Sequence, residues 1–371
     1  MALSFRELNH TVLLLASSTA YLKTKPTMKI QRIRPSNTRS ITSAIATLAL
    51  LASMGTVQAA IFKDAQLESL QDAGNYVELE RQAQARLKAD AGDAEASAAL
   101  SLALTFIDAG DAKRLEAGAK QAKRCVEQHP TAAVCHLATA QNLGMQMLSV
   151  GMFKAMRMLD TLKDSWSRTL ELAPDSFVAR VQLAKLYLTV PGMMGGSVSK
   201  AKELEAAVHT SQPETARIIR VNIAAEAKQW GAMEGELAAL KPGKDAAMRE
   251  EIRGATMQLA QVFLADSKDL AKARSLYATL LRDQPDHAAA YYGLGRVYTQ
   301  MGQADEAIRN FERAKTMTGA DEYPIEHRLG DAYLARGDKA QAKSAYERFI
   351  ANKRANPANL DDARKSLAKL G

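Results

Sequence analysis

The residue types that can do chemistry gather around the two cysteines of the chain. Cys125 and Cys135 lie five residues to either side of Pro130, with His129 and His136 beside them. Two thiolates and two imidazoles can bind zinc, but this crowded spacing resembles no zinc finger. We expect two antiparallel helices here, whose cysteines either form a disulfide or are buried as small apolar side chains. In the chain-entropy model, a bridge across this ten-residue loop would add about 2–3 kcal/mol of stability.

Methionines are the second group of side chains with a chemistry of their own. Several lie between residues 144 and 158, and two more lie in a Gly-rich loop at 193–194. Thioether side chains form a soft, polarizable surface that can receive an apolar ligand or a partner helix. The alternative is two long helices whose extra turns pack on each other, and a single Met-x-Met pair is a poor copper site. The candidate apolar-ligand residues are Met145, Met147, Met152, Met156, Met193 and Met194.

The Gly-rich loop at residues 190–198 precedes an expected helix. Its backbone N–H groups could hold an anion, but the Gly-Lys-Ser/Thr of a P-loop is missing. A fixed turn, with Ser197 or Ser199 capping the helix, is the favoured interpretation. No nucleophile elbow, His-Glu-x-x-His helix, dinucleotide fingerprint or kinase-like set occurs in the sequence. The sequence therefore predicts no enzyme, no cofactor and no metal site.

The positive charge of the chain is concentrated at its start. Residues 1–59 carry seven basic residues and one acidic residue, which leaves 42 basic and 40 acidic residues in the remainder of a chain whose net charge is +8. The remainder is close to neutral and lacks a basic stripe interleaved with aromatic side chains. We therefore expect no nucleic acid partner.

Residues 1–59 also have the pattern of a leader for export. Basic residues at 29–39 precede an apolar run at 41–54 and a small-residue site that ends at Ala59. This order is typical of a secretory signal peptide, with a true start at Met28, or else at Met1, and cleavage after Ala59. The apolar run is shorter than the ~20 residues that span a bilayer. We expect a periplasmic protein without a stable membrane span after cleavage.

Composition and internal repetition predict the fold. The chain is 47% apolar but only 5% aromatic, which favours packed helices over a β-sandwich. One unit at 288–314 recurs 35 residues later, and a related unit begins at Leu259-Ala260. The matched positions are Leu294 with Leu329, Gly295 with Gly330, Tyr298 with Tyr333, Gly302 with Gly337, Ala307 with Ala342, and Phe311 with Tyr346.

These residues and their period resemble the tetratricopeptide repeat (TPR) family, as in an exported bacterial member. Small residues such as Gly295 and Gly330 are expected where the two helices of a pair approach closely. The resemblance implies an all-α fold, a right-handed α-solenoid of about eight antiparallel helix pairs with a C-terminal capping helix. Residues 60–256 would form degenerate repeats with insertions at 142–158 and 190–198, and residues 257–371 well-formed repeats with the cap.

The resemblance also indicates which side chains line the inner, concave face, where TPR proteins bind peptides. Arg296 and Tyr292 form the first pair to test, because both residue types are frequent interface hot spots. The Lys and Asn clamp that some relatives use for a peptide carboxylate is absent, since Arg296 and Asp331 occupy matching places in successive units. The candidate partner-binding residues are Lys185, Arg220, Gln258, Gln261, Tyr292, Arg296, His327 and Asp331.

Two functions remain open on the sequence. The first is a non-catalytic periplasmic scaffold for protein–protein interaction in the cell envelope. The second is a binding protein for an apolar small molecule or a lipid-like ligand, linked to solute uptake, which uses the methionine-rich unit and the loop at 190–198. The two functions differ in what is bound: the first requires a protein or peptide partner, and the second requires an apolar small molecule or a lipid-like ligand.

Overall fold

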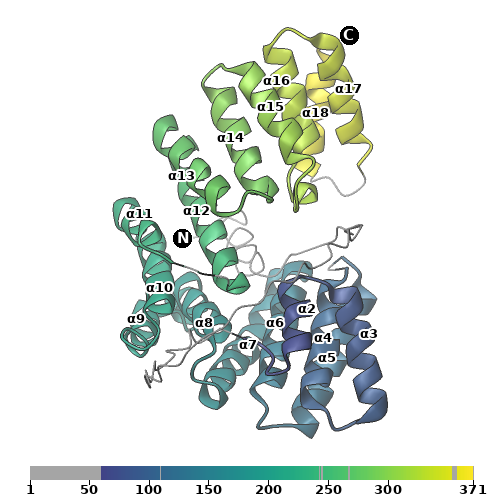
Figure 1. The fold of residues 1–371 in the computed structure, drawn as a ribbon, viewed down its shortest axis with the longest axis vertical. Coiled ribbons are helices and arrows are strands. Elements are labelled where there is room, and N and C mark those ends of the chain that lie inside the picture. Colours follow the sequence, from purple (N-terminus) through teal and green to yellow (C-terminus); the bar gives the residue numbers. More distant parts are fainter. Residues whose placement is uncertain are drawn as a thin grey trace, which may run out of the picture.

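The computed structural model describes residues 60–370, apart from positions 109, 242, 244, 266–267 and 353–356. The expected leader, residues 1–59, lies outside the described residues. The described part contains seventeen α-helices and two short 3-10 helices, and it contains no strand (Figure 1). The all-α prediction is confirmed. Within the same described ranges, no helix is both long enough and apolar enough to cross a bilayer.

Sixteen of these helices follow one another as eight pairs, and the last helix covers the end of the stack. This arrangement confirms the expected number of pairs and the capping helix. The pairs are α2 (Ala65–Asp72) with α3 (Tyr76–Ala89), α4 (Ala94–Phe106) with α5 (Ala112–Gln128), α6 (Ala133–Ser149) with α7 (Met152–Leu172), α8 (Phe177–Thr189) with α9 (Val198–Ala206), α10 (Pro213–Glu226) with α11 (Trp230–Ala238), α12 (Ala246–Ala265) with α13 (Leu270–Asp283), α14 (Ala288–Gln300) with α15 (Ala304–Ala314), and α16 (Ile325–Ala335) with α17 (Lys339–Ile350). The cap is α18 (Pro357–Ala368), and the 3-10 helices are η1 (Gly192–Met194) and η2 (Ala320–Glu322).

Local sequence signals fix where many helices begin. The Asp93 carboxylate accepts a hydrogen bond from the Ala96 N–H at the start of α4, and the Ser176 hydroxyl accepts one from the Ala179 N–H at the start of α8. These bonds satisfy N–H groups that have no partner within the first turn of a helix. Between α16 and α17, Gly337 takes the left-handed conformation (φ 86°) that a residue with a Cβ rarely adopts.

The predicted close approach within pairs is present. A Cβ added to Gly295 would lie 2.5 Å from the Phe311 ring, and one added to Gly330 would lie 2.4 Å from the Tyr346 ring. Both rings are fully buried. Each glycine on the first helix of a pair therefore receives an aromatic ring from the second helix.

The apolar core is distributed differently in the two halves of the chain. One cluster joins α2 to α10 and includes Met248 at the start of α12. Beyond α10, smaller clusters lie between successive pairs, as expected for a stack in which each repeat contacts only its neighbours. The start of α12 therefore packs against the N-terminal half, near the middle of the molecule in Figure 1.

The insertions differ in structure. The extra residues at 142–158 lengthen α6 and α7 to 17 and 21 residues, which matches the interpretation of two long helices. The loop at 190–198 contains η1 and closes on itself: a Cβ on Gly196 would lie 1.6 Å from the Val190 carbonyl oxygen. The backbone N–H groups of residues 194–197 donate to carbonyl oxygens of Pro191, Gly192 and Tyr187, so they are not available to an anion. Ser197 caps α9, as predicted.

Candidate functional site

A cavity of about 350 Å³ lies where the N-terminal helices approach the start of α12, and we call it the central cavity. Its walls come from the end of α2 and the start of α3, from α6, α7 and α8, and from the start of α12 with the loop between α13 and α14. Exposed Pro285 and Asp286 are among its lining residues, so the cavity reaches the surface on that side. Segments about 200 residues apart in the sequence thus share one site.

One side of the central cavity is apolar and aromatic. Trp166 on α7 lines it together with Phe177, Val178 and Val181 on α8, and all four side chains are buried. Helix α8 provides this surface because it is packed on all sides: eleven of its thirteen residues are buried. The volume and the aromatic lining are in the range of sites that bind small molecules or anchor side chains of a partner.

The charged part of the lining comes mainly from the first two turns of α12. Glu250 pairs with Arg253, whose guanidinium also donates to Gln284 Oε1 at 3.3 Å. Burial raises the pKa of Glu250 to about 7, although the charge of Arg253 works in the opposite direction. Glu250 therefore changes its charge near neutral pH within the cavity wall.

Two carboxyl groups, Glu68 and Asp72, lie on α2, and Asp72 lines the cavity. Glu68 accepts hydrogen bonds from the backbone N–H groups of Ile61 and Phe62 at 2.8–3.0 Å. Burial, with a smaller contribution from Asp72 and Asp245, raises the pKa of Glu68 to about 7. Asp72 is exposed at the rim of the cavity, and burial and the charge of Asp245 raise its pKa as well. Asp72 is therefore the carboxyl group that α2 contributes to the cavity.

Of the predicted inner-face residues, Lys185 is bonded to α12 and Gln258 belongs to that helix. The Lys185 Nζ atom lies 3.1 Å from Glu251 Oε2, and both side chains are about nine-tenths buried. Lys185 and Gln258 line a smaller cavity of about 80 Å³ between α8 and α12. The expectation that Lys185 is free to meet a partner is corrected, because the fold neutralises its charge internally.

The other basic candidates are also paired within the fold. Arg220 on α10 forms ion pairs with Glu236 at 2.8 Å and Glu205 at 2.5 Å. Arg296 donates a hydrogen bond to Gln261 and lies over the Tyr292 ring, 6.0 Å from its centre. These guanidinium groups are half-buried and hold neighbouring helices together.

Tyr292 and His327 are turned into the core instead of facing solvent. The Tyr292 ring stacks on Tyr323 with 4.7 Å between ring centres, and Tyr292 is 8% exposed. His327 is fully buried and stacks on Phe349 at 5.2 Å. Burial lowers the pKa of His327. For these two positions the inner-face assignment is corrected, since the aromatic and imidazole rings fill space between neighbouring helices.

Asp331 is likewise engaged within the last repeat. Its carboxylate accepts hydrogen bonds from the Tyr346 hydroxyl at 2.8 Å and from Arg328 at 2.9 Å. It also lies 3.9 Å from the His327 ring. The eight predicted inner-face residues are therefore spread along the solenoid, and none of them lines the central cavity.

The six candidate methionines do not share the central cavity either. Met145 lines it, whereas Met147 is buried in the core. Met152, Met156 and Met193 are exposed, and Met194 packs against the main apolar cluster. The expectation of one apolar site made by the methionine-rich unit and the loop at 190–198 is corrected, because the long helices bury only part of the set.

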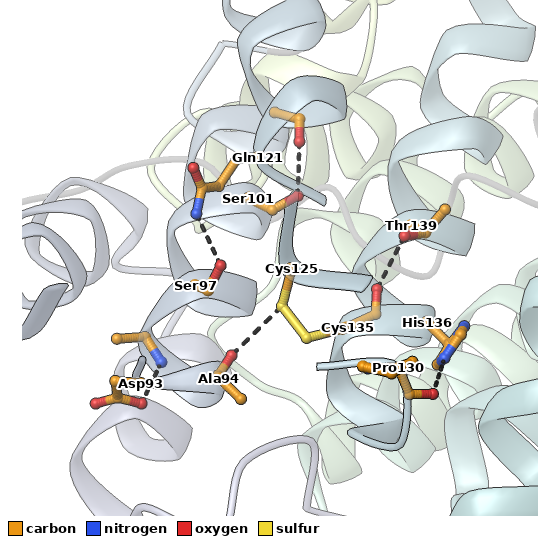
Figure 2. The surroundings of a disulfide bond; sticks show 12 residues. Asp93, Ala94, Ser97, Ser101, Gln121, Cys125, Pro130, Cys135, His136 and Thr139 are labelled. Carbon is orange, nitrogen blue, oxygen red and sulfur yellow. Dashed lines mark hydrogen bonds between the residues drawn. A yellow bond between two sulfur atoms is a disulfide. The ribbon is translucent and has the colours of Figure 1, made fainter. Parts of the chain in front are cut away.

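The cysteine pair lies in the hairpin between α5 and α6 (Figure 2). The two sulfur atoms are bonded, and the Cα atoms are 5.3 Å apart, within the usual range for a disulfide. Cys125 Sγ lies 3.5 Å from the Ala94 carbonyl oxygen, and the His136 ring contacts the Pro130 carbonyl oxygen at 2.9 Å. The described ranges contain no cluster of three or more His, Cys, Asp or Glu residues suited to a metal.

Sequence reasoning missed the residues that line the central cavity. Two signals could have found them. Trp166 is one of only two tryptophans in an aromatic-poor chain, and the run Arg249-Glu-Glu-x-Arg253 places four charges at the start of a helix that is otherwise largely apolar. Neither signal indicates that α7 and α12 line the same cavity, because that depends on how the stack of helices curves.

Two segments of the chain match models of a known protein family. Residues 264–318 match one family model described as a tetratricopeptide repeat, and residues 327–352 match another. No curated protein matches the chain. The two matched segments correspond to α13–α15 and to α16–α17.

The solved structures that match the chain share little sequence with it. A tetratricopeptide repeat protein from Parabacteroides merdae is 13% identical, with a TM-score of 0.40, and the match covers 80% of this chain and 98% of that one. Yeast Tom70 is 15% identical, with a TM-score of 0.40, over 80% of this chain and 63% of Tom70. PilW, a type IV pilus biogenesis factor, is 12% identical, with a TM-score of 0.35, over 67% of this chain and 91% of PilW.

Proposed function

Because the chain is a tetratricopeptide repeat protein, we propose that it is a non-catalytic periplasmic scaffold that binds a segment of another protein in its central cavity. The observation that carries this proposal is the cavity itself, which is lined by aromatic side chains of α7 and α8 and by charged side chains of α12. Buried aromatic pockets with charged rims are where the energetically important side chains of protein partners bind.

Two observations support the periplasmic setting. The disulfide between Cys125 and Cys135 suits an oxidising compartment. The segment just after Ala59 is also anchored: the Glu95 carboxylate accepts the backbone N–H groups of Lys63 at 3.0 Å and Asp64 at 2.9 Å. Cleavage after Ala59 would thus leave a mature chain whose first residues are already bound to the fold.

Cell fractionation with mass spectrometry of the N-terminal peptide tests the setting. We expect the protein in the periplasmic fraction, with Ala60 as its first residue. Recovery of an unprocessed chain from the cytoplasm would overturn the periplasmic assignment.

Site-specific crosslinking in cells tests the binding function. A photo-reactive amino acid at Asp286, exposed at the mouth of the cavity, should give one crosslinked protein. The same group at Lys123, exposed on the second helix of its pair and outside the cavity, is the matched control. Identical adducts from both positions, or none from Asp286, would count against a partner in the cavity.

The alternative of a small apolar ligand retains one supporting observation. The cavity volume of about 350 Å³ lies within the range of small-molecule pockets. Such a ligand would contact Trp166 and Phe177, with Met145 as the sole contribution from the methionine set. Native mass spectrometry of the protein isolated from cells separates the two functions, since only a small ligand adds a mass of a few hundred daltons.

A further inference from the structure

The charges around the central cavity are not balanced within the fold. Glu251 is neutralised by Lys185, and Glu250 by Arg253. Asp72 and Asp286, which also line the cavity, form no ion pair in the part of the chain that the structure describes. Arg249 also lines the cavity and forms no ion pair among the described residues; its guanidinium donates to the Asp283 carbonyl oxygen. The cavity thus presents two unpaired carboxylates against one unpaired guanidinium, an excess of negative charge.

Asp72 lies at an unfavourable place for a carboxylate. It is the last residue of α2, where the helix dipole disfavours negative charge, and partial burial, with a smaller contribution from the charge of Asp245, raises its pKa. A position that costs stability without a compensating partner is expected where function requires the group.

A buried amide provides a second, independent indication of a ligand. Gln141 on α6 lines the cavity and is 7% exposed, and its Oε1 atom has no hydrogen-bond partner among the described residues. Leaving a buried acceptor unpaired destabilises the folded protein. A ligand that donates a hydrogen bond into the cavity would remove this cost.

Aromatic rings line the same cavity. Trp166 is 5% exposed and Phe177 is 2% exposed, and both face the cavity. Aromatic faces attract cations as well as apolar groups. The excess of carboxylates over guanidinium groups, the unpaired acceptor and the aromatic rings together favour a positively charged donor attached to an apolar body over an anion.

We propose that the central cavity binds a protonated amine carried on an apolar group. The ammonium lies towards Asp72 and Gln141, and the apolar part lies along Trp166 and Phe177. This inference deepens the proposed function, because it names the chemistry that the same cavity selects. The amine can be a free organic amine or a lysine side chain within a partner segment, which share this chemistry.

Trp166 provides a direct readout of binding. The chain has two tryptophans, and Trp230 on α11 lies outside the cavity, so the Trp230→Phe protein reports on Trp166 alone. The purified full chain is titrated at pH 7.5 with octylamine, octanol and octanoate, which share an eight-carbon chain. We expect saturable binding of octylamine at least tenfold tighter than octanol, and no binding of octanoate. Equal binding of octylamine and octanol, or preference for octanoate, would overturn the proposal.

Two substitutions locate the ammonium. Asp72→Asn and Gln141→Leu should each weaken octylamine binding at least fivefold. Both should fold, because the first removes a charge that the helix end disfavours and the second removes an unpaired buried acceptor. Asp160→Asn, which removes an exposed carboxylate of α7 outside the cavity, is the control and should leave binding unchanged. Unchanged binding in both cavity variants would place the amine elsewhere and overturn the proposal.

A second titration distinguishes the two sources of the amine. The peptide acetyl-Leu-Lys-Leu-amide is compared with acetyl-Leu-Gln-Leu-amide as competitors of octylamine. Displacement by the lysine peptide alone supports a partner lysine, and saturable octylamine binding without displacement supports a free amine. If neither octylamine nor the lysine peptide binds while the Asp286 crosslink persists, the inference fails and the proposed scaffold function stands.

Discussion

At the scale of single residues, glycine in the repeat sets how closely two helices approach. An added Cβ at Gly330 would lie 2.4 Å from the Tyr346 ring, which is fully buried and cannot move without disturbing the core. We expect Gly330→Ala to lower the free energy of unfolding by about 1–2 kcal/mol, since overpacking outweighs the better helix propensity of alanine. Urea unfolding measures the change.

Gly254 on α12 is the matched control for this prediction. Nothing lies within 4 Å of a Cβ added there. Gly254→Ala should therefore raise the free energy of unfolding by about 0.5–1 kcal/mol through helix propensity alone. Destabilisation of similar size in both variants would contradict the packing argument.

Glu250 gives a prediction for pH at the same scale. Burial raises its pKa from the ordinary 4.5 to about 7, so the folded state holds a proton that the unfolded chain has lost. Its favourable contribution is complete below pH 4.5 and is lost as the pH rises through about 7. Glu250→Gln cannot lose this proton, so relative to the wild type it should gain stability between pH 5 and pH 8, by at most about 3 kcal/mol.

Urea unfolding of both proteins at pH 5 and pH 8 measures this difference. Glu250→Gln also weakens the bond to Arg253, which lowers the free energy of unfolding of the variant. This loss does not change the expectation that the variant gains stability relative to the wild type as the pH rises. If the free energy of unfolding of Glu250→Gln relative to the wild type is the same at pH 5 and pH 8, or is lower at pH 8, the pKa of Glu250 is not raised and the prediction is wrong.

At the scale of elements, the disulfide joins α5 to α6 across a ten-residue separation. Replacing both cysteines by serine should lower the free energy of unfolding by about 2–3 kcal/mol, because the unfolded chain regains the entropy that the loop had lost. Urea unfolding of the oxidised protein against the double variant measures the change. A reductant should bring the wild type to the level of the variant and leave the variant unaffected; equal stability without reductant would contradict the prediction.

At the scale of the whole molecule, the Lys185–Glu251 ion pair joins α8 to α12, 66 residues apart. Glu251→Ala leaves the buried ammonium of Lys185 without its carboxylate and should cost about 3–5 kcal/mol in thermal or urea unfolding. Replacing both residues by methionine removes both charges and should cost far less. If the double variant is as unstable as Glu251→Ala, packing and not charge dominates at this contact.

Much of the fold was predictable from the sequence because its signals are local. The 35-residue recurrence of Leu294, Gly295 and Phe311 depends on contacts within one pair of helices, and the structure has those contacts. The number of pairs, the capping helix and the cap at Ser197 follow from the same short-range rules. Neighbouring helices in a solenoid interact mainly with each other, so a periodic pattern is sufficient to determine them.

The candidate site was decided by tertiary structure. Lys185 and His327 have the polarity of surface residues, but both are buried. Lys185 pairs with a carboxylate of α12, and the His327 ring stacks on Phe349. The central cavity brings Asp72, Gln141 and Trp166 together with the start of α12, and no periodic pattern relates these positions. Their meeting depends on the curvature summed over the stack, to which every pair contributes a small rotation. The total curvature depends on packing along the whole chain, so it cannot be predicted from the sequence of single repeats.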